Sequence, residues 1–414
     1  MPSCYLTSLM PWSTRRHGRK GEIVKDVVYL DNAATSWPKP PEMMEAMAGF
    51  NRSIGANPGR SGHSRSVDAG RVLLDAREAL ADLLGATDML GVIFTANATQ
   101  ALNIVISGLL KEGGHAVCTS MEHNSVMRPL NAARARGACY SAAPCSSAGE
   151  LDPAELIPLI RPDTRLIVMT HASNVTGTLM PIAEVASIAR EREVPLCVDA
   201  SQTAGAVSID VDAMGIGLLA FTGHKSLYGP QGTGGLVISQ GLEQKIDPLM
   251  QGGTGSRSEF EVQPDFLPDK YESGTPNAIG IAGLNAGVDF IRRRGVDAVR
   301  AHEKELTARL ISGLESIPGV KIFGPGDAHR QTPVVSFTLK GMAPSELALA
   351  LDEEFDVMSR PGLHCAPSAH RSIGTFPEGT LRLSPGLFTT PGQIDHVVEA
   401  VASLGLKART GAVK

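Results

Sequence analysis

The chain has 414 residues, which is enough for a large core and two domains. Its 38 basic and 43 acidic side chains leave a formal net charge of −5, so no broad basic field favours a nucleic acid as a partner. Glycine is abundant, with 44 residues, and aromatic residues make up only 4% of the chain. This composition is typical of a loop-rich α/β enzyme and argues against an all-β binding module.

Membrane and metal-stabilised proteins are also disfavoured. No apolar run approaches the roughly 20 residues that a bilayer-spanning helix needs, so we expect no membrane as a partner. The cysteines lack CxxC spacing, so we expect neither a disulfide framework nor a bound metal, and we expect a cytoplasmic protein. The six cysteines are Cys4, Cys118, Cys139, Cys145, Cys197 and Cys365.

The first residues differ from the rest of the chain. Five basic or histidine residues lie between positions 15 and 20, before the first acidic residue, Glu22. The apolar segment Cys4–Trp12 is short, contains Pro11 and follows no basic segment, which argues against a secretory signal; a transit peptide is an alternative. We expect residues 1–24 to form a flexible N-terminal arm.

From Val27 onward, short apolar runs alternate with helical patterns. Apolar residues recur at helical spacing from Val67 to Leu84, and Gly85 is expected to end that helix. This alternation predicts a mostly parallel sheet covered on both faces, in which ligands gather at the carboxyl ends of the strands. The predicted strands are Gly91–Thr95, His115–Ser120, Leu166–Thr170, Pro195–Asp199, Gly217–Phe221 and Gly234–Ile238.

A long apolar helix, Asn277–Arg294, is expected to connect this part to a second one. We expect residues 25–290 to form a large domain and residues 291–414 a smaller C-terminal domain. The elements expected after the connector are strands Val320–Phe323 and Pro333–Leu339, helix Pro344–Phe355, strands around Val357 and Leu381, and a last helix from Pro391, capped by Thr390 and ended by Gly405.

One lysine stands out at a predicted strand end. Lys225 follows the strand Gly217–Phe221 and lies among small and turn-forming residues. A lysine in this setting is placed to form an imine with a carbonyl compound, and pyridoxal phosphate (PLP) is the commonest protein-bound aldehyde of that kind. An isolated lysine in a glycine-rich turn is more often a surface residue, so the assignment depends on other residues.

The first of these is Asp199, which ends the strand Pro195–Asp199. A carboxylate there can pair with the protonated pyridine nitrogen of PLP and keep the ring electron-withdrawing. An aspartate after a strand also often caps the next helix, and taken alone Asp199 fits both interpretations. Gln202 three residues later, and Lys225 after the next strand, favour the cofactor site.

A phosphate site is expected where Ala98 and Thr99 open a helix after the strand that ends at Thr95. Free N–H groups and the helix dipole both favour an anion there, although a plain threonine cap is a common alternative. Thr222 and His224 flank Lys225 and can add donors to the same phosphate. The chain has no GxxxxGK[ST] element and no GxGxxG after a strand, so nucleotide binding lacks its usual signature.

His123 follows the strand that ends near Ser120. It can stack on a flat ring and move protons near neutral pH, although most lone histidines are structural. Arg360 and Arg382 are candidates for binding a substrate carboxylate, because a guanidinium group matches a carboxylate with two hydrogen bonds. A surface salt bridge is the more usual role of an arginine.

Cys365 differs from the other cysteines. It lies in a polar turn bounded by glycine and proline, beside His364, with Arg360 and His370 near in sequence. Positive neighbours lower the pKa of a thiol and make it a nucleophile, although an incidental loop cysteine is the alternative. Cys118 and Cys197 lie inside predicted strands and are expected to be inert.

Together these motifs resemble the class V, fold type I PLP enzymes, and within them the cysteine desulfurases and selenocysteine lyases of the group II (SUF-type) branch. The resemblance runs from about Val27 to Leu404 and implies an α/β PLP-dependent transferase. Its large domain would hold a mostly parallel seven-stranded sheet, and a smaller C-terminal α+β domain would carry the nucleophilic cysteine. The matching segments are Tyr29–Thr35, Ala98-Thr99, Glu122-His123, Ser173–Gly177, Val198–Gln202, Gly223–Lys225, Ser273–Pro276 and Arg360–Cys365.

The resemblance also implies a role for each matching residue. Lys225 would carry PLP and later move protons, and Cys365 would attack the sulfur of the substrate. The remaining cofactor residues would be Asp199 at the pyridine nitrogen, Gln202 near the ring hydroxyl, His123 stacked on the ring, and Ala98, Thr99, Thr222 and His224 at the phosphate, with Thr275 supplied by the other subunit of a homodimer. The substrate would contact Ala33, Asn174, Arg360 and Arg382.

The implied activity is conversion of L-cysteine to L-alanine, with a persulfide on Cys365 that passes to an acceptor protein. Two features depart from the group II pattern: one extra residue between Lys225 and Tyr228, and an unusual segment from Cys365 to Arg382. The short path around Cys365 predicts a well-ordered nucleophile and weak turnover without an acceptor. Selenocysteine lysis, a class V aminotransferase or epimerase that does not use Cys365, and an inactive PLP-fold scaffold stay open as alternatives.

Overall fold

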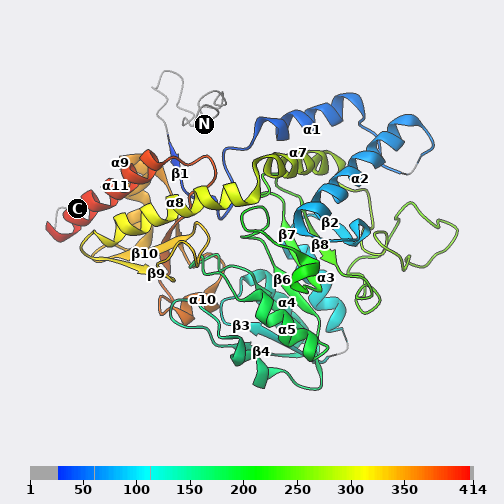
Figure 1. Ribbon diagram of the computed structural model, residues 1–414, viewed down its shortest axis with the longest axis horizontal. Helices are drawn as coiled ribbons and strands as arrows, with labels where there is room; N and C mark the ends of the chain where they lie inside the picture. Colours follow the sequence, from blue (N-terminus) through cyan, green and yellow to red (C-terminus); the bar gives the residue numbers. More distant parts are fainter. Residues whose placement is uncertain (1–26, 60, 112, 411–414) are drawn as a thin grey trace.

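The computed structural model describes residues 27–59, 61–111 and 113–410; the arm expected over residues 1–24 lies outside them. A seven-stranded sheet forms the centre of the larger unit, in the order β2-β8-β7-β6-β5-β3-β4 (Figure 1). Only β8 runs antiparallel to its neighbours, so the predicted mostly parallel sheet is confirmed. The strands are β2 (Val92–Thr95), β3 (His115–Thr119), β4 (Cys139–Ala143), β5 (Thr164–Thr170), β6 (Leu196–Asp199), β7 (Leu218–Thr222) and β8 (Gly234–Ile238).

Helices cover both faces of this sheet because its strands alternate between two cores. Val117 packs with α2, α5 and α7 on one face, whereas the next residue, Cys118, packs with α3 and α4 on the other. Gly85 ends α2 in the left-handed conformation with φ of 65°, as predicted. The helices are α1 (Pro41–Ser53), α2 (Ser64–Leu84), α3 (Ala98–Leu109), α4 (Asn124–Arg134), α5 (Ile182–Glu191), α6 (Val211–Met214) and α7 (Ala278–Arg294), with the short 3-10 turns η1 (Met89–Gly91) and η2 (Pro153–Leu159).

The C-terminal unit, drawn from yellow to red in Figure 1, lies beside the large sheet. Its antiparallel sheet has the order β12-β13-β10-β9 and packs against α8, α9 and α11 through a separate apolar core. The elements are α8 (Val296–Glu315), β9 (Val320–Phe323), β10 (Val335–Leu339), α9 (Pro344–Phe355), β11 (Val357–Met358), β12 (Arg360–Gly362), α10 (Pro367–Ser372), β13 (Thr380–Leu383) and α11 (Pro391–Thr410).

This unit differs from expectation in several details. α8, β12 and α10 were not among the elements predicted after the connector. The prediction that Gly405 ends the last helix is wrong: α11 continues to Thr410. Gly405 is buried inside the helix, where a Cβ atom would make ordinary van der Waals contact at 3.4 Å from the Leu339 side chain, so packing does not require glycine there. The first strand, β1 (Val28–Tyr29), pairs with β11 and shares the C-terminal core, whereas the division at residues 290 and 291 stays a prediction.

The helices of the described residues are too short or too polar to cross a bilayer.

Candidate functional site

A pocket of about 230 Å³ lies where the carboxyl ends of β5, β6 and β7 meet the C-terminal unit. Parallel strands end at one edge of a sheet, and this edge is where α/β proteins bind ligands. Every residue predicted for the site lines this pocket except Thr275: Ala33, Ala98, Thr99, His123, Asn174, Asp199, Gln202, Thr222, His224, Lys225, Arg360, Cys365 and Arg382. The structure therefore brings the predicted residues together, and their individual roles stay predictions.

The turn that carries Lys225 is tightly folded. The Tyr228 N–H donates to the Lys225 carbonyl over 2.9 Å, and the Gly229 N–H donates to the Gly223 carbonyl over 2.8 Å. A Cβ atom at Gly223 would lie 2.2 Å from Thr233 Oγ1, so only glycine fits there. This close approach holds Lys225 at the end of β7, where its side chain lines the pocket.

Two residues that were given no role from the sequence, Lys39 and Ser36, support this turn with hydrogen bonds. Lys39 Nζ donates to the His224 carbonyl and to Ser36 Oγ, both over 2.7 Å. Ser36 Oγ in turn donates to the Lys225 carbonyl over 2.8 Å. Burial lowers the pKa of Lys39 to about 7. Their position just after the Tyr29–Thr35 motif is the signal that points to them.

The Lys225 amine is suited to react with an aldehyde near neutral pH. Burial lowers its pKa to about 8; Asp199 opposes the shift, and Arg382 and Arg360 add to it. Only the neutral amine is a nucleophile, and a desolvated lysine supplies it at lower pH than an exposed one. The chemistry expected of a PLP lysine therefore fits the environment of Lys225.

Asp199 and His123 both line the pocket. Asp199 is 5% exposed, and its Oδ1 accepts hydrogen bonds from the backbone N–H and the hydroxyl of Ser201. His123 precedes α4, and its Nδ1 accepts the Ser125 N–H over 3.0 Å. Burial lowers the pKa of His123 to about 4, so its ring is neutral at pH 7 and carries its proton on Nε2. A neutral flat ring can stack on another ring.

A phosphate-sized anion has ready donors at the start of α3. Asn97 caps this helix by accepting the Gln100 N–H over 3.0 Å, which leaves the first N–H groups free to face the pocket. Thr222 Oγ1 and His224 Nδ1 are buried and have no hydrogen-bond partner within the described part of the chain. Buried polar atoms are almost always hydrogen-bonded in native proteins, so these two atoms favour a ligand there.

Cys365 lies in an exposed turn of the C-terminal unit that the large unit holds in place. The Asn124 N–H donates to the Cys365 carbonyl over 2.8 Å, and Asn174 Nδ2 donates to the His364 carbonyl over 2.7 Å. Arg360 Nη2 lies 3.9 Å from Cys365 Sγ. The sulfur thus faces the pocket that Lys225 lines, next to a guanidinium group.

The nearby histidines do not supply the positive charge that the sequence predicted around this thiol. His364 and His370 are 3% and 0% exposed. Burial lowers the pKa of His364 to about 2 and that of His370 to about 4, so both rings are neutral at pH 7. That expectation is wrong for the histidines, and the positive charges at this end of the pocket come from Arg360 and Arg382.

Arg382 does not form a surface salt bridge, which was the alternative to binding a substrate carboxylate. It is 1% exposed, pairs with Asp31 Oδ1 over 2.7 Å and donates to the Asn174 carbonyl over 3.0 Å. Its Nε has no partner among the described residues. Arg360 lies directly opposite Arg382 across β12 and β13. Directly opposite residues project from the same face of a sheet, so both guanidinium groups line the pocket, where they can bind a carboxylate.

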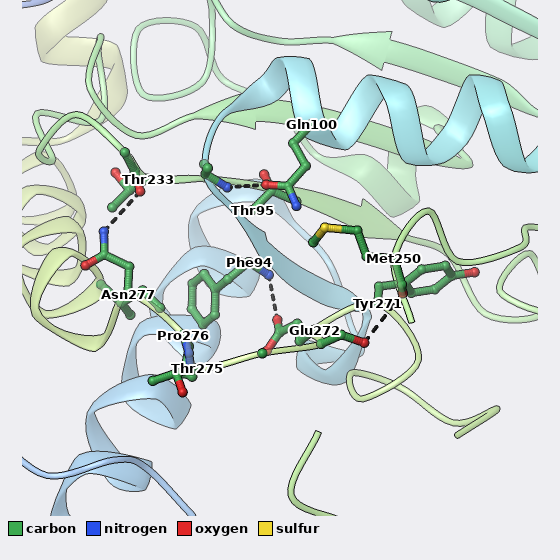
Figure 2. Close-up of a pocket in the computed structure, with 16 residues that line it drawn as sticks. Phe94, Thr95, Gln100, Thr233, Met250, Tyr271, Glu272, Thr275, Pro276 and Asn277 are labelled. Carbon is green, nitrogen blue, oxygen red and sulfur yellow. Dashed lines mark hydrogen bonds between the residues drawn. The ribbon is translucent and has the colours of Figure 1, made fainter. Parts of the chain in front are cut away.

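Thr275 lies apart from these residues. It lines a second cavity, also of about 230 Å³, beside β2 and the start of α7 (Figure 2). There Glu272 Oε1 accepts the Phe94 N–H over 2.6 Å, and Asn277 Nδ2 donates to the Gly232 carbonyl over 3.1 Å. The prediction that Thr275 serves the site of another subunit stays a prediction.

Several pocket residues were not assigned to the site from the sequence: Ala34, Asn97, Ser125, Thr170, Ala172, Ser201 and His364. All of them except Thr170 lie within two residues of a predicted site residue; for example, Ala34 follows Ala33 and His364 precedes Cys365. A strand-end turn brings successive residues to one edge, so treating each whole turn as a candidate would have found them.

Comparisons with known proteins agree on one family. The Aminotransferase class-V family model matches residues 28–397. A probable cysteine desulfurase of Methanothermobacter thermautotrophicus is 34% identical over 391 residues, covering 92% of this chain and 96% of that protein. A probable cysteine desulfurase of Halobacterium salinarum is 35% identical and covers 91% of both chains.

Solved structures give the same picture. The apo cysteine desulfurase of Thermococcus onnurineus NA1 superimposes with a TM-score of 0.85 at 30% identity, over 92% of this chain and 95% of that one. The cysteine desulfurase CsdA of Escherichia coli, in an S-sulfonic acid form, superimposes with a TM-score of 0.82 at 27% identity and the same coverage.

Proposed function

This chain belongs to the aminotransferase class V family, and on that premise we propose that it is a PLP-dependent cysteine desulfurase. It converts L-cysteine to L-alanine and transfers the sulfur to Cys365. The single observation that carries the proposal is that Lys225, Asp199 and Cys365, from different elements and both units, line one pocket. The cysteine desulfurases among its relatives support the same substrate.

The residues present fit the cofactor. PLP, when bound, withdraws electrons from the amino acid and so weakens its bonds. Asp199 would pair with the pyridine nitrogen and His123 would lie against the ring. The unpartnered Thr222 Oγ1 and His224 Nδ1, together with the N-terminus of α3, would hold the phosphate.

The protein side of the reaction follows from the pocket. Arg382 and Arg360 bind the substrate carboxylate, which orients the substrate sulfur toward Cys365. The Cys365 thiolate attacks that sulfur, so an S–S bond forms as the C–S bond breaks. The electron pair of the broken bond stays with the carbon fragment, which takes up a proton and leaves as alanine. Lys225 Nζ is suited to move that proton, because its pKa of about 8 lets it bind and release one near neutral pH.

The finer parts of the proposal concern partners. We propose a homodimer in the cytoplasm, with Thr275 reaching the phosphate site of the partner, and an acceptor protein that takes sulfur from Cys365, as in the SUF-type branch. Leu249, Met250, Phe260 and Val262 are exposed apolar residues in the segment that precedes Thr275. Such residues gathered in one segment are typical of a surface that another chain covers.

The test is a single-turnover reaction of purified protein with L-cysteine and, in parallel, with L-selenocysteine. We expect one alanine per persulfide, detected on the peptide that contains Cys365. Cys365→Ser should keep the yellow absorbance of the cofactor and lose alanine formation from cysteine by roughly a hundredfold or more. Cys139→Ser, which changes a half-buried thiol outside the pocket, is the matched control and should leave the rate unchanged.

Two results would contradict the proposal. The nucleophile assignment fails if Cys365→Ser forms alanine from cysteine at the wild-type rate. The substrate assignment fails if wild-type protein forms alanine only from selenocysteine.

A further inference from the structure

The turn that presents Cys365 has a backbone conformation that its own residues disfavour. His364 has φ of 49° and Cys365 has φ of 58°. Both values lie in the left-handed region, where a Cβ atom crowds the following carbonyl oxygen. Two consecutive non-glycine residues hold such a conformation only when the surroundings over-determine it. The contacts of the His364 ring are among the surroundings that can hold this conformation.

A chain of buried hydrogen bonds runs from that ring into the following helix and loop. His364 Nε2 lies 3.0 Å from the Arg360 carbonyl oxygen, and His364 Nδ1 lies 3.2 Å from His370 Nε2. His370 Nδ1 lies 2.7 Å from the hydroxyl of Thr375. His364, His370 and Thr375 are 3%, 0% and 8% exposed, so water does not substitute for these bonds.

The Arg360 carbonyl, together with the neutrality of the two rings, determines where the protons lie in this series of hydrogen bonds. A carbonyl oxygen only accepts, so His364 carries a proton on Nε2. Because burial keeps the ring neutral, this is its only ring N–H proton, and Nδ1 is an acceptor. His370 must then donate from Nε2, which leaves His370 Nδ1 to accept the Thr375 O–H. Both rings are neutral in this arrangement, in agreement with burial, which lowers the pKa of both histidines. The charged groups nearest His364, Arg382 and Arg360, also disfavour a second proton.

Because both of its ring nitrogens are hydrogen-bonded, His364 has no free nitrogen. It cannot act as an acid or base toward Cys365, although it is the adjacent residue. It does connect the strained turn to Arg360, whose guanidinium group lies 3.9 Å from the sulfur. A rotation of the His364 ring would release the turn and shift the sulfur relative to that group.

We propose that Thr375, His370 and His364 form a positioning relay that holds the Cys365 sulfur over the pocket for attack on the substrate. The proposal rests on the proposed function and adds three residues that do not touch the reacting atoms. The hydroxyl of Thr375 orients the His370 ring, His370 orients the His364 ring, and His364 holds the turn.

The functional test compares Thr375→Val with Thr375→Ser. Valine removes the donor with little change of shape, whereas serine keeps it. We expect persulfide formation on Cys365 in a single turnover to slow by roughly tenfold to a hundredfold in Thr375→Val, because a misplacement of about 1 Å has this effect. KM for cysteine should stay within about twofold, because the arginines that bind the substrate are unchanged. Thr375→Ser should restore the rate.

Two results of this comparison would overturn the relay. One is a wild-type rate in Thr375→Val, and the other is a Thr375→Ser variant as slow as Thr375→Val. Far-ultraviolet circular dichroism and the cofactor absorbance identify a variant that has not folded.

A second measurement does not depend on activity. Protein labelled with ¹⁵N in its histidine rings reports the protonated nitrogen of each ring by NMR, with His364→Gln and His370→Gln used to assign the signals. We expect neutral rings with the proton on Nε2 for both histidines from pH 6 to pH 8. A charged ring, or a proton on His370 Nδ1, would overturn the relay. If wild-type protein forms no persulfide, the proposed function fails, and this measurement still decides the relay.

Discussion

At the scale of single residues, burial decides which groups carry charge in and around the pocket. His123, His224, His364 and His370 are all neutral at pH 7, because burial lowers the pKa of each to about 4 or below. The pKa of Lys225, about 8, lies close to neutral pH, so this lysine is only partly charged there. Fixed positive charge therefore comes mainly from the arginines, which suits recognition of a substrate carboxylate.

Glu122 gives a residue-scale prediction about stability. It is fully buried beneath the pocket, and its Oε1 accepts the hydroxyl of Thr119 over 2.6 Å and the backbone N–H of Thr170 over 3.2 Å. Burial raises its pKa from 4.5 to about 8. The unfolded chain thus loses this proton above pH 4.5, while the folded protein keeps it up to about pH 8. The contribution of Glu122 to stability should therefore fall, by on the order of a few kcal/mol, as pH rises from 4.5 to 8, and it should change no further above pH 8.

Urea unfolding of Glu122→Gln and wild-type protein at several values between pH 5 and pH 8 measures this effect. Glutamine keeps the acceptor and cannot ionise, so the variant should lose less stability than the wild type over this range. Glu399→Gln, at an exposed position of α11, is the matched control and should follow the wild type. Parallel pH profiles for Glu122→Gln and the wild type would show that Glu122 does not keep its proton.

At the scale of elements, the site is built from the ends of strands and the starts of helices. β6 ends at Asp199, β7 ends just before the Lys225 turn, and α3 and α4 begin at the pocket. Parallel pairing aligns the carboxyl ends of the strands, and the helices that follow direct their free N–H groups to the same edge. Residues far apart in sequence reach one pocket for this reason.

The Lys225 turn yields the element-scale prediction. In Gly223→Ala the new methyl group would lie 2.2 Å from Thr233 Oγ1 and 2.9 Å from the Leu284 side chain. Thr233 is β-branched and buried, so it cannot move aside freely. We expect a loss of about 1–3 kcal/mol in the free energy of unfolding and weaker cofactor binding. Gly49→Ala, in α1 with no atom within 4 Å, should instead stabilise the protein by about 0.5–1 kcal/mol. Chemical denaturation distinguishes the two, and equal effects would contradict the steric account.

At the scale of the whole molecule, the pocket belongs to neither unit alone. Asp31 follows β1 and pairs with the buried Arg382 of β13, while the Asn124 N–H of the large unit holds the Cys365 carbonyl. The Cys365 turn therefore depends on contacts from both sides. Thr275, which is proposed to reach the phosphate site of a partner chain, lines the second cavity and lies apart from these residues.

The whole-molecule prediction concerns that dimer. Phe260 and Val262 are 59% and 75% exposed, so in the proposed dimer they are expected to pack against the partner. We expect wild-type protein to have the mass of two chains in light scattering and Phe260→Asp/Val262→Asp to shift toward one. Leu349→Asp changes a residue of α9 that is 57% exposed and should leave the mass unchanged. A wild-type protein with the mass of a single chain would refute the dimer.

The sequence by itself determined the type and order of most elements, because helix and strand periodicity and caps such as Gly85 are local properties. It also indicated which residues gather at the strand ends. It missed β4, an edge strand whose short run of small residues has no apolar pattern. It also misinterpreted Gly405, which lies inside α11, a helix that continues to Thr410.

Only the tertiary structure decided the protonation of the histidines near Cys365, the support of the Lys225 turn by Lys39, and the pairing of β1 with β11. Each of these depends on which distant segments exclude water from a residue or approach it within hydrogen-bond distance. Burial and close contact are set by the packing of the whole chain, and no local pattern of residues encodes them.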